Sequence, residues 1–332
     1  MSEATPKKRR FSFWRLVGRV FSIIGVTVLA LCILVVGFCG VLCKGPSPTA
    51  RATFVNTMLE TSALKFVPSI FLSDEEIQEI VEGNTVVEPD ESSDPDMEFS
   101  DQDVSDEIEV LDVKGPSYSG KMMIVHDPSR VKVACLNTFS EEIDGRTVKH
   151  FAQQNNAVAC INGGGFSDEN GMGKGGMPLG IVIRDGKLVF GSPHTSSSVI
   201  AFDNENRLIV GTMTAQAALD RGVRDALSFG PAFIVNGKPA EVSGTSGGVN
   251  PRTVVGQRAD GSVLLLVIDG RQPHSLGATY KECIDVMLEF GAVNAANLDG
   301  GTSTGMWYNG EIINSPASLY GPRYIPTAFV VI

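Results

Sequence analysis

The longest apolar stretch of the chain covers residues 20–43 and contains no charged residue. Its length is sufficient to cross a hydrocarbon core of about 30 Å as an α-helix. Basic side chains gather on its N-terminal side, between Lys7 and Arg19. Because positive charge favours the cytoplasmic side, we predict a single-pass signal anchor in the cell membrane. Residues 1–19 would form a cytoplasmic tail, and the C-terminal part would be extracellular. A cleaved signal peptide is the alternative, but no clear Ala-x-Ala cleavage site follows the stretch.

The pattern changes twice before the folded domain begins. Residues 44–83 are predicted to form a helical stalk, whose last helix starts with a capping box of Ser73 and Glu76. Residues 84–107 are acidic, rich in Pro and Ser and poor in aliphatic side chains, which predicts a disordered linker. We therefore expect the folded domain to occupy residues 108–332.

Strand-like alternation with tight turns dominates that domain. Three segments place Asp-Gly or Asn-Gly between β-favouring residues, which predicts tight hairpins. A fourth segment, MMIVHDPSRVKVACL, predicts another strand pair. The four segments cover residues 181–190, 232–240, 306–314 and 122–136.

Helices are expected over only three ranges of the domain, 147–156, 214–221 and 279–290. The last helix lies between two apolar runs, SVLLLVI (262–268) and AVNAANL (292–298), and this order predicts a parallel βαβ unit near the C-terminus. We therefore expect an α+β fold with mixed sheets, several β-hairpins and this βαβ unit, preceded by one transmembrane helix.

Two aspartates directly follow the strands of the βαβ unit. Asp269 and Asp299 would lie at the same edge of the sheet, where ligands bind in sheets of this kind. Gly300 and Gly301 would allow a substrate to approach the backbone closely. Each aspartate taken alone could instead cap a loop, but their paired placement indicates a functional site.

The amino-acid composition does not alter the predicted fold or the candidate site. The net charge of −11 arises from residues 73–112, which contain 17 acidic and no basic side chains. Basic residues elsewhere form no nucleic-acid recognition motif, so we expect no nucleic-acid partner. Cys135, Cys160 and Cys283 lie in apolar patterns and are predicted to be small buried hydrophobes, with no zinc-type spacing.

A serine motif offers a different chemistry. GTSTG, at residues 301–305, matches the G-x-S-x-G nucleophile elbow around Ser303. In the α/β-hydrolase order the acid and the histidine follow the serine. Neither His nor Asp occurs after Ser303 in this sequence. A serine esterase is therefore the weaker hypothesis.

Glycine-rich stretches and two arginines complete the candidate chemistry. INGGGF (161–166) and GMGKGGMPLG (171–180) predict backbone held close to a ligand, and neither fits a nucleotide-binding pattern. Arg252 and Arg271 could present planar guanidinium groups to a phosphate or carboxylate. A structural salt bridge is the alternative for each arginine.

Five motifs, in chain order, resemble the phosphodiester glycosidase domain family: INGGGF, LSFGPAFIVNG, NPRTVVGQ, LLLVIDGR and NLDGGTSTGMWYNG. The resemblance spans roughly Gly115 to Ile332. It implies a hydrolase that cleaves a glycosyl-1-phosphodiester to free sugar and a phosphate monoester. Similar domains occur on bacterial cell-surface proteins behind a single anchor. We therefore expect a membrane-anchored bacterial member that acts on a sugar phosphodiester, and the topology suggests cell-surface glycopolymers as its substrates.

The resemblance also suggests roles for the candidate residues. Asp299 or Asp269 would act as base or nucleophile, and Arg252 and Arg271 would bind the phosphate. If a divalent cation such as Ca²⁺ or Mg²⁺ is required, the two aspartates would hold it; no other cofactor is expected. The expected substrate-binding residues are Arg252, Arg271, Asn162, Gly163, Gly164, Gly300, Gly301, Thr302 and Ser303.

A second class of function uses the same pocket without turnover. A non-catalytic surface polysaccharide-binding or assembly protein would retain the binding groups and release no product. Thr302 stands where relatives commonly have glycine, and this difference is compatible with such a protein.

Overall fold

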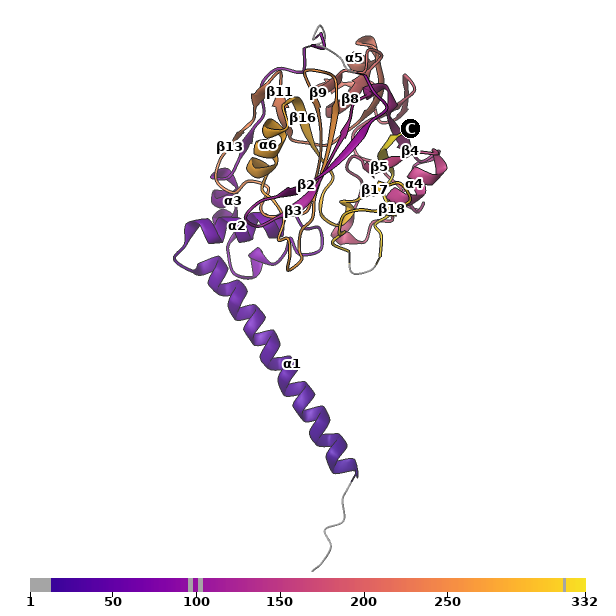
Figure 1. The fold of residues 1–332 in the computed structure, drawn as a ribbon. Helices are drawn as coiled ribbons and strands as arrows, with labels where there is room; N and C mark the ends of the chain where they lie inside the picture. The colour runs from indigo at the N-terminus through magenta and orange to yellow at the C-terminus, as the bar shows by residue number, and fades with distance from the viewer. Residues whose placement is uncertain (1–12, 95–97, 101–103, 319–320) are drawn as a thin grey trace, which may run out of the picture.

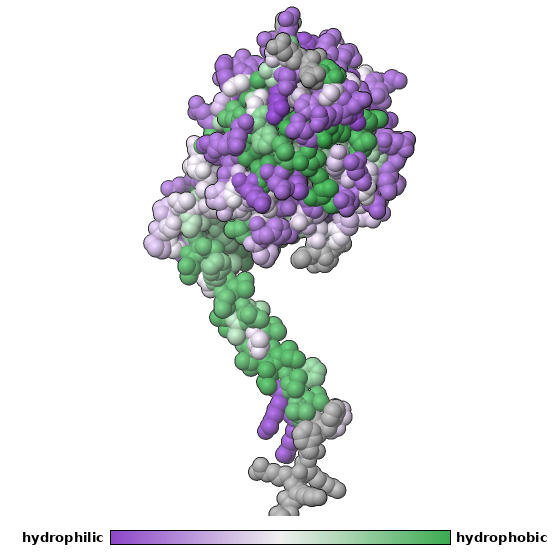
Figure 2. All heavy atoms as spheres, in the orientation of Figure 1, coloured by the Kyte–Doolittle hydropathy of each residue, from purple (hydrophilic) through white to green (hydrophobic). Residues whose placement is uncertain are grey.

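The structure, shown in Figure 1, is a computed structural model that describes residues 13–94, 98–100, 104–318 and 321–332. Its first helix, α1 (Phe13–Lys44), extends away from the rest of the chain. Over Trp14–Lys44 this helix is long and apolar enough to cross a membrane, by length and composition. Its surface is almost entirely hydrophobic (Figure 2). The predicted span, 20–43, lies within it, and residues 1–12 of the predicted tail lie outside the described residues.

The stalk packs against the C-terminal end of α1. It consists of α2 (Pro48–Leu59), the 3-10 helix η1 (Pro68–Ile70) and α3 (Asp74–Glu82). The predicted capping box of Ser73 and Glu76 opens α3. Cys43 of α1 packs with Val55 and Leu72 in a small apolar cluster. Burial of these side chains fixes the stalk to the helix, so the two do not form a freely jointed tether.

Three antiparallel sheets form most of the domain. The largest has the strand order β12-β11-β16-β14-β15-β3-β2. Its strands are β2 (Ile108–Lys114), β3 (Ser119–Val125), β11 (Ala232–Val235), β12 (Lys238–Pro239), β14 (Arg252–Arg258), β15 (Val263–Ile268) and β16 (Ala292–Leu298).

The two smaller sheets have five strands each, in the orders β18-β17-β5-β19-β4 and β7-β6-β10-β8-β9. The first contains β4 (Val131–Cys135), β5 (Ala159–Asn162), β17 (Met306–Tyr308), β18 (Glu311–Ile312) and β19 (Thr327–Val331). The second contains β6 (Val182–Arg184), β7 (Lys187–Phe190), β8 (Ser196–Asp203), β9 (Leu208–Thr214) and β10 (Val223–Leu227).

One buried core joins the three sheets. Leu265 of the seven-stranded sheet, Phe329 of the first small sheet and Phe202 of the second all belong to it. The other face of each sheet is covered by one helix, because apolar side chains alternate between the two faces of a strand. These helices are α6 (Tyr280–Glu289), α4 (Val148–Gln154) and α5 (Ala215–Asp220).

The local predictions are largely confirmed. The fold is α+β, and the three helices lie where we expected them. All three Asp-Gly or Asn-Gly hairpins form, with Asp185, Asn236 and Asn309 at positive φ as such turns require. The strand pair expected over 122–136 is wrong, because β3 and β4 belong to different sheets.

The βαβ unit is present in a modified form. β15 and β16 each pair antiparallel with β14, which lies between them, so they run in the same direction without pairing. The direct parallel pairing is therefore wrong. The cause is the β14–β15 hairpin: β14 occupies the place beside β15, and the crossover through α6 delivers β16 to the far side of β14. Both strands still end at the same edge of the sheet.

The described part of the acidic segment contacts the domain. β1 (Val86–Val87) pairs with β13 (Glu241–Val242). The hydroxyl of buried Ser93 accepts a hydrogen bond from the Val210 amide of β9 at 3.0 Å. In residues 84–94 the backbone therefore finds partners on strand edges, in contrast to the disorder we expected. Residues 95–97 and 101–103 of the predicted linker lie outside the described residues.

Candidate active site

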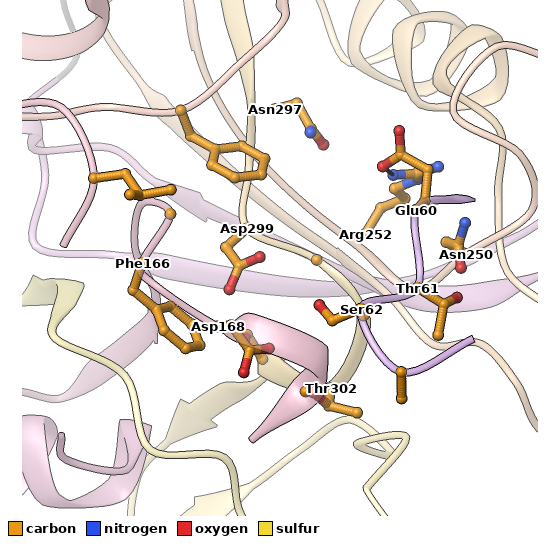
Figure 3. Close-up of a pocket in the computed structure, with 18 of the residues that line it drawn as sticks. Glu60, Thr61, Ser62, Phe166, Asp168, Asn250, Arg252, Asn297, Asp299 and Thr302 are labelled. Carbon is orange, nitrogen blue, oxygen red and sulfur yellow. Dashed lines mark ion pairs between the residues drawn. The ribbon is translucent and has the colours of Figure 1, made fainter. Parts of the chain in front are cut away.

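A pocket with a volume of about 320 Å³ lies at the edge where β14, β15 and β16 begin or end (Figure 3). Its walls come from residues 60–63 of the stalk, from the glycine-rich loop after β5 and from the loop after β16. The two loops contain the 3-10 helices η3 (Glu169–Gly171) and η4 (Gly301–Ser303). Asp299 and Asp168 lie on one side of the pocket, and Arg252 and Arg271 lie on the other side with Glu60 beside Arg252.

Asp299 is the central carboxyl group of the acidic side. It directly follows β16 and points into the pocket. Burial raises its pKa to about 7, against the lowering effects of a hydrogen bond from Ser303 and one from the Gly300 backbone. The charge of Asp168 raises this pKa further. A carboxyl with such a pKa can exchange a proton near neutral pH, as a general acid or base must.

Asp168, on the glycine-rich loop, is the second carboxyl group of the pocket. It accepts hydrogen bonds from the Arg323 guanidinium at 2.6 Å and from the Gly173 amide at 2.8 Å. Both carboxyl groups point into the same space in Figure 3. The two carboxyl groups differ in surroundings, and such a difference divides acid–base roles between paired carboxylates in hydrolases.

Asn297 adds an unsatisfied acceptor to this side of the pocket. Its amide nitrogen donates to the Gly230 carbonyl at 3.0 Å. Its Oδ1 atom is buried and has no hydrogen-bond partner among the described residues. A buried polar atom without a partner is costly, so a donor on a bound ligand would satisfy it. The aromatic residues Phe166 and Phe229 line the same region.

Arg252, at the start of β14, is fixed mainly by the fold. Its guanidinium donates to the backbone carbonyls of Gly247 and Gly248 and lies 4.3 Å above the ring of Tyr280. The side chain is only 3% exposed. Its Nη1 atom is 3.8 Å from the carboxylate of Glu60 on the stalk. Arg252 therefore contributes charge to the pocket, while most of its donors are already used.

Arg271 reaches the pocket from the loop after β15. It adopts a φ of +57°, which is unusual for a non-glycine residue. Its Nη2 atom donates to Asn250 Oδ1 at 2.9 Å and to Thr61 Oγ1 at 3.0 Å. Burial and the charge of Arg252 lower its pKa, while Asp299 and Glu60 oppose this effect. Two adjacent guanidinium groups favour a bound anion such as phosphate.

The loop after β16 approaches both arginines. Gly301 has a φ of +59°, and a side chain there would lie 3.4 Å from the Arg271 guanidinium. A side chain at Gly300 would meet the Pro251 carbonyl at 2.7 Å. Thr302 and Ser303 follow and line the pocket. The two glycines thus let the loop pass close to the cationic side.

Asp269 lies at the same sheet edge but outside this pocket. Its Oδ1 atom accepts hydrogen bonds from Asn314 Nδ2 at 3.0 Å and from the Ser315 amide at 2.8 Å. Because β14 separates β15 from β16, the two aspartates are not on neighbouring strands. Asp299 therefore lines the pocket, whereas Asp269 binds the loop at residues 314–315.

Three other predicted binding residues also lie behind the pocket wall. Asn162 is fully buried, and its amide donates to the Asp299 carbonyl at 2.6 Å. Side chains at Gly163 and Gly164 would collide with Thr327 and Ser228. The need for glycine at these two positions comes from close packing. Asn162 supports the loop after β16 without lining the pocket, and Gly165 is the glycine of this run that does line it.

Metal ligands are not apparent in the part of the chain that the structure describes. It contains no group of three or more His, Cys, Asp or Glu side chains that could hold an ion. The predicted pair of Asp269 and Asp299 is divided between the 314–315 loop and the pocket. Cys135, Cys160 and Cys283 are buried and free, as expected from their apolar patterns.

Sequence reasoning missed Asp168, Asn297 and the stalk residues 60–63. Asp168 directly follows INGGGFS, so an acidic residue after the glycine run was an available signal. Asn297 belongs to the NLDGG motif itself. The stalk residues carried no comparable signal, because only the tertiary fold brings them beside Arg252 and Arg271.

Comparisons with known proteins identify the family of this chain. Residues 155–332 match the sequence model described as phosphodiester glycosidase. The chain is 28% identical over 179 residues to the SPbeta prophage-derived uncharacterized protein YomE of Bacillus subtilis (strain 168), covering 51% of this chain and 27% of that protein. It is 28% identical over 189 residues to the N-acetylglucosamine-1-phosphodiester alpha-N-acetylglucosaminidase of Bos taurus, covering 52% and 35%. The chain thus spans about a third or less of these relatives.

Solved structures show the same fold. The zebrafish N-acetylglucosamine-1-phosphodiester alpha-N-acetylglucosaminidase catalytic domain, auto-inhibited by its pro-peptide, aligns with a TM-score of 0.57 at 22% identity, over 74% of this chain and 88% of that one. A putative exported protein from Burkholderia pseudomallei aligns with a TM-score of 0.50 at 18% identity, over 65% and 74%. The family match covers more than half of the chain. The chain belongs to the phosphodiester glycosidase family.

Proposed function

We propose that the chain is a hydrolase that cleaves a glycosyl-1-phosphodiester into free sugar and a phosphate monoester. The observation that carries this proposal is the division of one pocket into two sides. Asp299, with a pKa of about 7, and Asp168 lie on one side, and Arg252 and Arg271 lie on the other. The carboxyl groups would act at the anomeric carbon of the sugar, and the guanidinium groups would bind the phosphate. Membership of the family supports the same reaction.

The proposed step breaks the bond between the anomeric carbon and its oxygen. A water oxygen attacks the anomeric carbon, and ionised Asp299 accepts the water proton. The electron pair of the broken bond stays on the departing oxygen of the phosphate monoester. Arg271 stabilises that charge, so the leaving group needs little protonation. Asp168 stabilises the positive charge that develops on the sugar ring, as the second carboxylate of a glycosidase does.

Asn297 and the aromatic residues support sugar binding on the acidic side. The unpartnered Oδ1 atom of Asn297 can accept a hydrogen bond from a sugar hydroxyl or an acetamido N–H. Phe166 and Phe229 offer apolar surface to a sugar face. The family relatives named for N-acetylglucosamine make that sugar the first to test.

The proposal extends to location and domain organisation. Residues 1–19 would be cytoplasmic, 20–43 would span the membrane and 44–83 would form the stalk. Residues 84–107 would link the stalk to the extracellular hydrolase domain, 108–332. The excess of basic residues before the span supports this orientation. Cell-surface glycopolymers would then be within reach.

Product analysis tests the reaction directly. The full-length protein in detergent should be incubated with UDP-N-acetylglucosamine and with methyl N-acetylglucosaminyl phosphate, with and without EDTA. Mass spectrometry should detect free N-acetylglucosamine from both substrates, together with UDP from the first and methyl phosphate from the second. Sugar-1-phosphate would instead mean cleavage at the other ester and would contradict the proposal. A shorter protein beginning near residue 108 is unsuitable, because it removes the wall formed by residues 60–63.

The alternatives predict different outcomes of the same assay. A polysaccharide-binding or assembly protein would bind the diester and release no product. A serine esterase would be labelled at Ser303 by a fluorophosphonate, and no histidine is among the residues that line the described pocket. Loss of turnover in EDTA would indicate a metal and would require a new account of Asp299.

A further inference from the structure

The stalk enters the pocket on its cationic side. Thr61 accepts a hydrogen bond from Arg271 at 3.0 Å, and the Glu60 carboxylate lies 3.8 Å from Arg252. Asp299, Asp168 and Phe166 lie on the opposite side in Figure 3. If the proposed function holds, the sugar lies beside Asp299 and the phosphate beside Arg271. The alcohol esterified to that phosphate would then lie beside the stalk residues that line the pocket.

The stalk also connects this side of the pocket to the membrane-spanning helix. Phe71, just after η1, packs against Gly40 of α1, where a side chain would lie 3.3 Å from the Phe71 ring. Leu72 packs with Cys43. Gly40 and Cys43 both belong to the predicted span, 20–43. Residues 71–72 therefore lie at the level of the last turn of the span, at the membrane surface.

Between the pocket wall and these anchoring residues lies a short exposed apolar segment. Leu64, Phe66 and Ile70 are 43%, 58% and 61% exposed. We call these three side chains the exit patch. Figure 2 shows hydrophobic surface continuing from α1 onto the adjoining part of the molecule. Apolar side chains beside a membrane span, with Lys65 among them, are typical of segments that lie in the lipid interface.

Contacts between α1, the stalk and the domain hold the pocket at a fixed position relative to the membrane-spanning helix. Lys44 pairs with Glu76 at 2.7 Å, beside the buried contact between Cys43 and Leu72 that holds the stalk against α1. Thr57 Oγ1 of α2 accepts a hydrogen bond from the Val249 amide at 2.9 Å, and Asn56 contacts Thr245. Because α1, the stalk and the domain are joined in this way, the pocket is held at a fixed height close to the bilayer.

We propose that the substrate is a glycosyl phosphodiester whose alcohol is a lipid in the same bilayer. This inference rests on the proposed function and names its substrate class. The lipid chain leaves the pocket past Thr61 and across the exit patch into the membrane. Hydrolysis places the water oxygen on the sugar, which is released, and leaves the lipid phosphate monoester in the bilayer.

Two substrates with the same sugar test this inference. Full-length protein is reconstituted in phosphatidylcholine vesicles and assayed with hexadecyl N-acetylglucosaminyl phosphate in the bilayer or with the methyl diester in solution. In the variant Phe66→Ser/Ile70→Ser, we expect turnover of the hexadecyl diester to fall about tenfold, because the patch no longer enters the lipid. Turnover of the methyl diester should stay within about twofold of the wild type, because these side chains do not line the pocket.

Two further variants sharpen the result. The control Val189→Ser/Leu288→Ser removes exposed apolar side chains outside the stalk and should change neither rate. A ten-residue Gly/Ser insertion after Gly45 loosens the connection between α1 and the stalk and should lower only the rate with the hexadecyl diester. Equal loss with both substrates, or hydrolysis of the methyl diester alone by the wild type, would overturn this inference and leave the proposed function intact. Hydrolysis of neither diester would overturn both.

Discussion

Asp269 and Asp299 follow two strands of the same direction and stand at one edge of the sheet, yet their surroundings differ. Asp269 accepts two hydrogen bonds at Oδ1 from residues 314–315, and its Oδ2 atom lies 4.0 Å from His274 Nε2. Asp299 faces a pocket, and burial raises its pKa to about 7. The comparison shows that a position at the end of a strand brings a carboxyl group to the edge of the sheet. The neighbouring loop then determines whether that carboxyl group is held by hydrogen bonds within the fold or faces the pocket.

The largest effect should come from the pocket aspartate. Asp299→Asn removes the proton acceptor, so we expect kcat to fall about a thousandfold, within the range of general acid–base catalysis. Initial rates on the methyl diester measure this loss. The matched control is Asp269→Asn, which retains an oxygen acceptor and should keep most of the activity. Equal losses in the two variants would remove the distinction between the two sites.

The cationic side should give the next largest effect. Arg271→Met keeps the length of the side chain but removes the charge opposite Asp299, and we expect kcat/KM to fall about a hundredfold. Arg221→Met serves as a control, because Arg221 contacts Ser92 far from the pocket lining. Unchanged turnover in Arg271→Met would mean that the phosphate is bound elsewhere.

Asp269 should matter for stability more than for rate. Asp269→Ala leaves the Asn314 amide and the Ser315 N–H without their acceptor, so we expect a loss of about 2 kcal/mol in the free energy of unfolding. Denaturant unfolding of the full-length protein in detergent measures it. Asp269→Asn should recover part of the stability. A stable Asp269→Ala protein with no activity would instead place Asp269 in the chemistry.

The pH dependence should follow Asp299. Its pKa is raised above the ordinary value, so the folded state binds its proton more tightly than the unfolded state does. Stability should therefore decline as pH rises from about 4 to about 7, and Asp299→Asn should lack this decline. Because the base acts in its ionised form, kcat/KM should rise through about pH 7. A flat profile across neutral pH would contradict the base role.

Ser303 should have the smallest effect. Its hydrogen bond lowers the Asp299 pKa, so Ser303→Ala should move the rising limb of the pH–rate profile to higher pH. At pH well above that limb the variant should retain most of its rate, within a few-fold, because the lost hydrogen bond is worth about 1 kcal/mol. Complete inactivity of this variant across the pH range would indicate that Ser303 takes part directly in the reaction.

Features encoded by neighbouring residues were predictable. The Asn-Gly turn at 236–237 and the capping box of Ser73 and Glu76 depend on local hydrogen bonds and backbone conformations, and both form as expected. The position of Asp299 beyond its strand was predictable for the same reason. These signals specify local geometry without specifying which distant segments meet.

Features that depend on distant contacts were not predictable. The hairpin that places β14 between β15 and β16 has no local signature that fixes strand order. The approach of Glu60 and Thr61 to the two arginines joins segments that lie far apart in the sequence, with Thr61 and Arg271 separated by 210 residues. A turn residue or a capping residue carries no information about such partners, so the stalk wall of the pocket emerged only from the tertiary structure.

Identification of the bond that breaks tests the proposed mechanism most directly. Wild-type protein should hydrolyse the methyl diester in water enriched in ¹⁸O, and both products should be weighed by mass spectrometry. Attack at the anomeric carbon, with Asp299 as base and Arg271 beside the departing phosphate, predicts that the label enters the sugar and that the phosphate monoester stays unlabelled. Label in the phosphate would show attack at phosphorus and would contradict the assignment of the acidic side to the sugar.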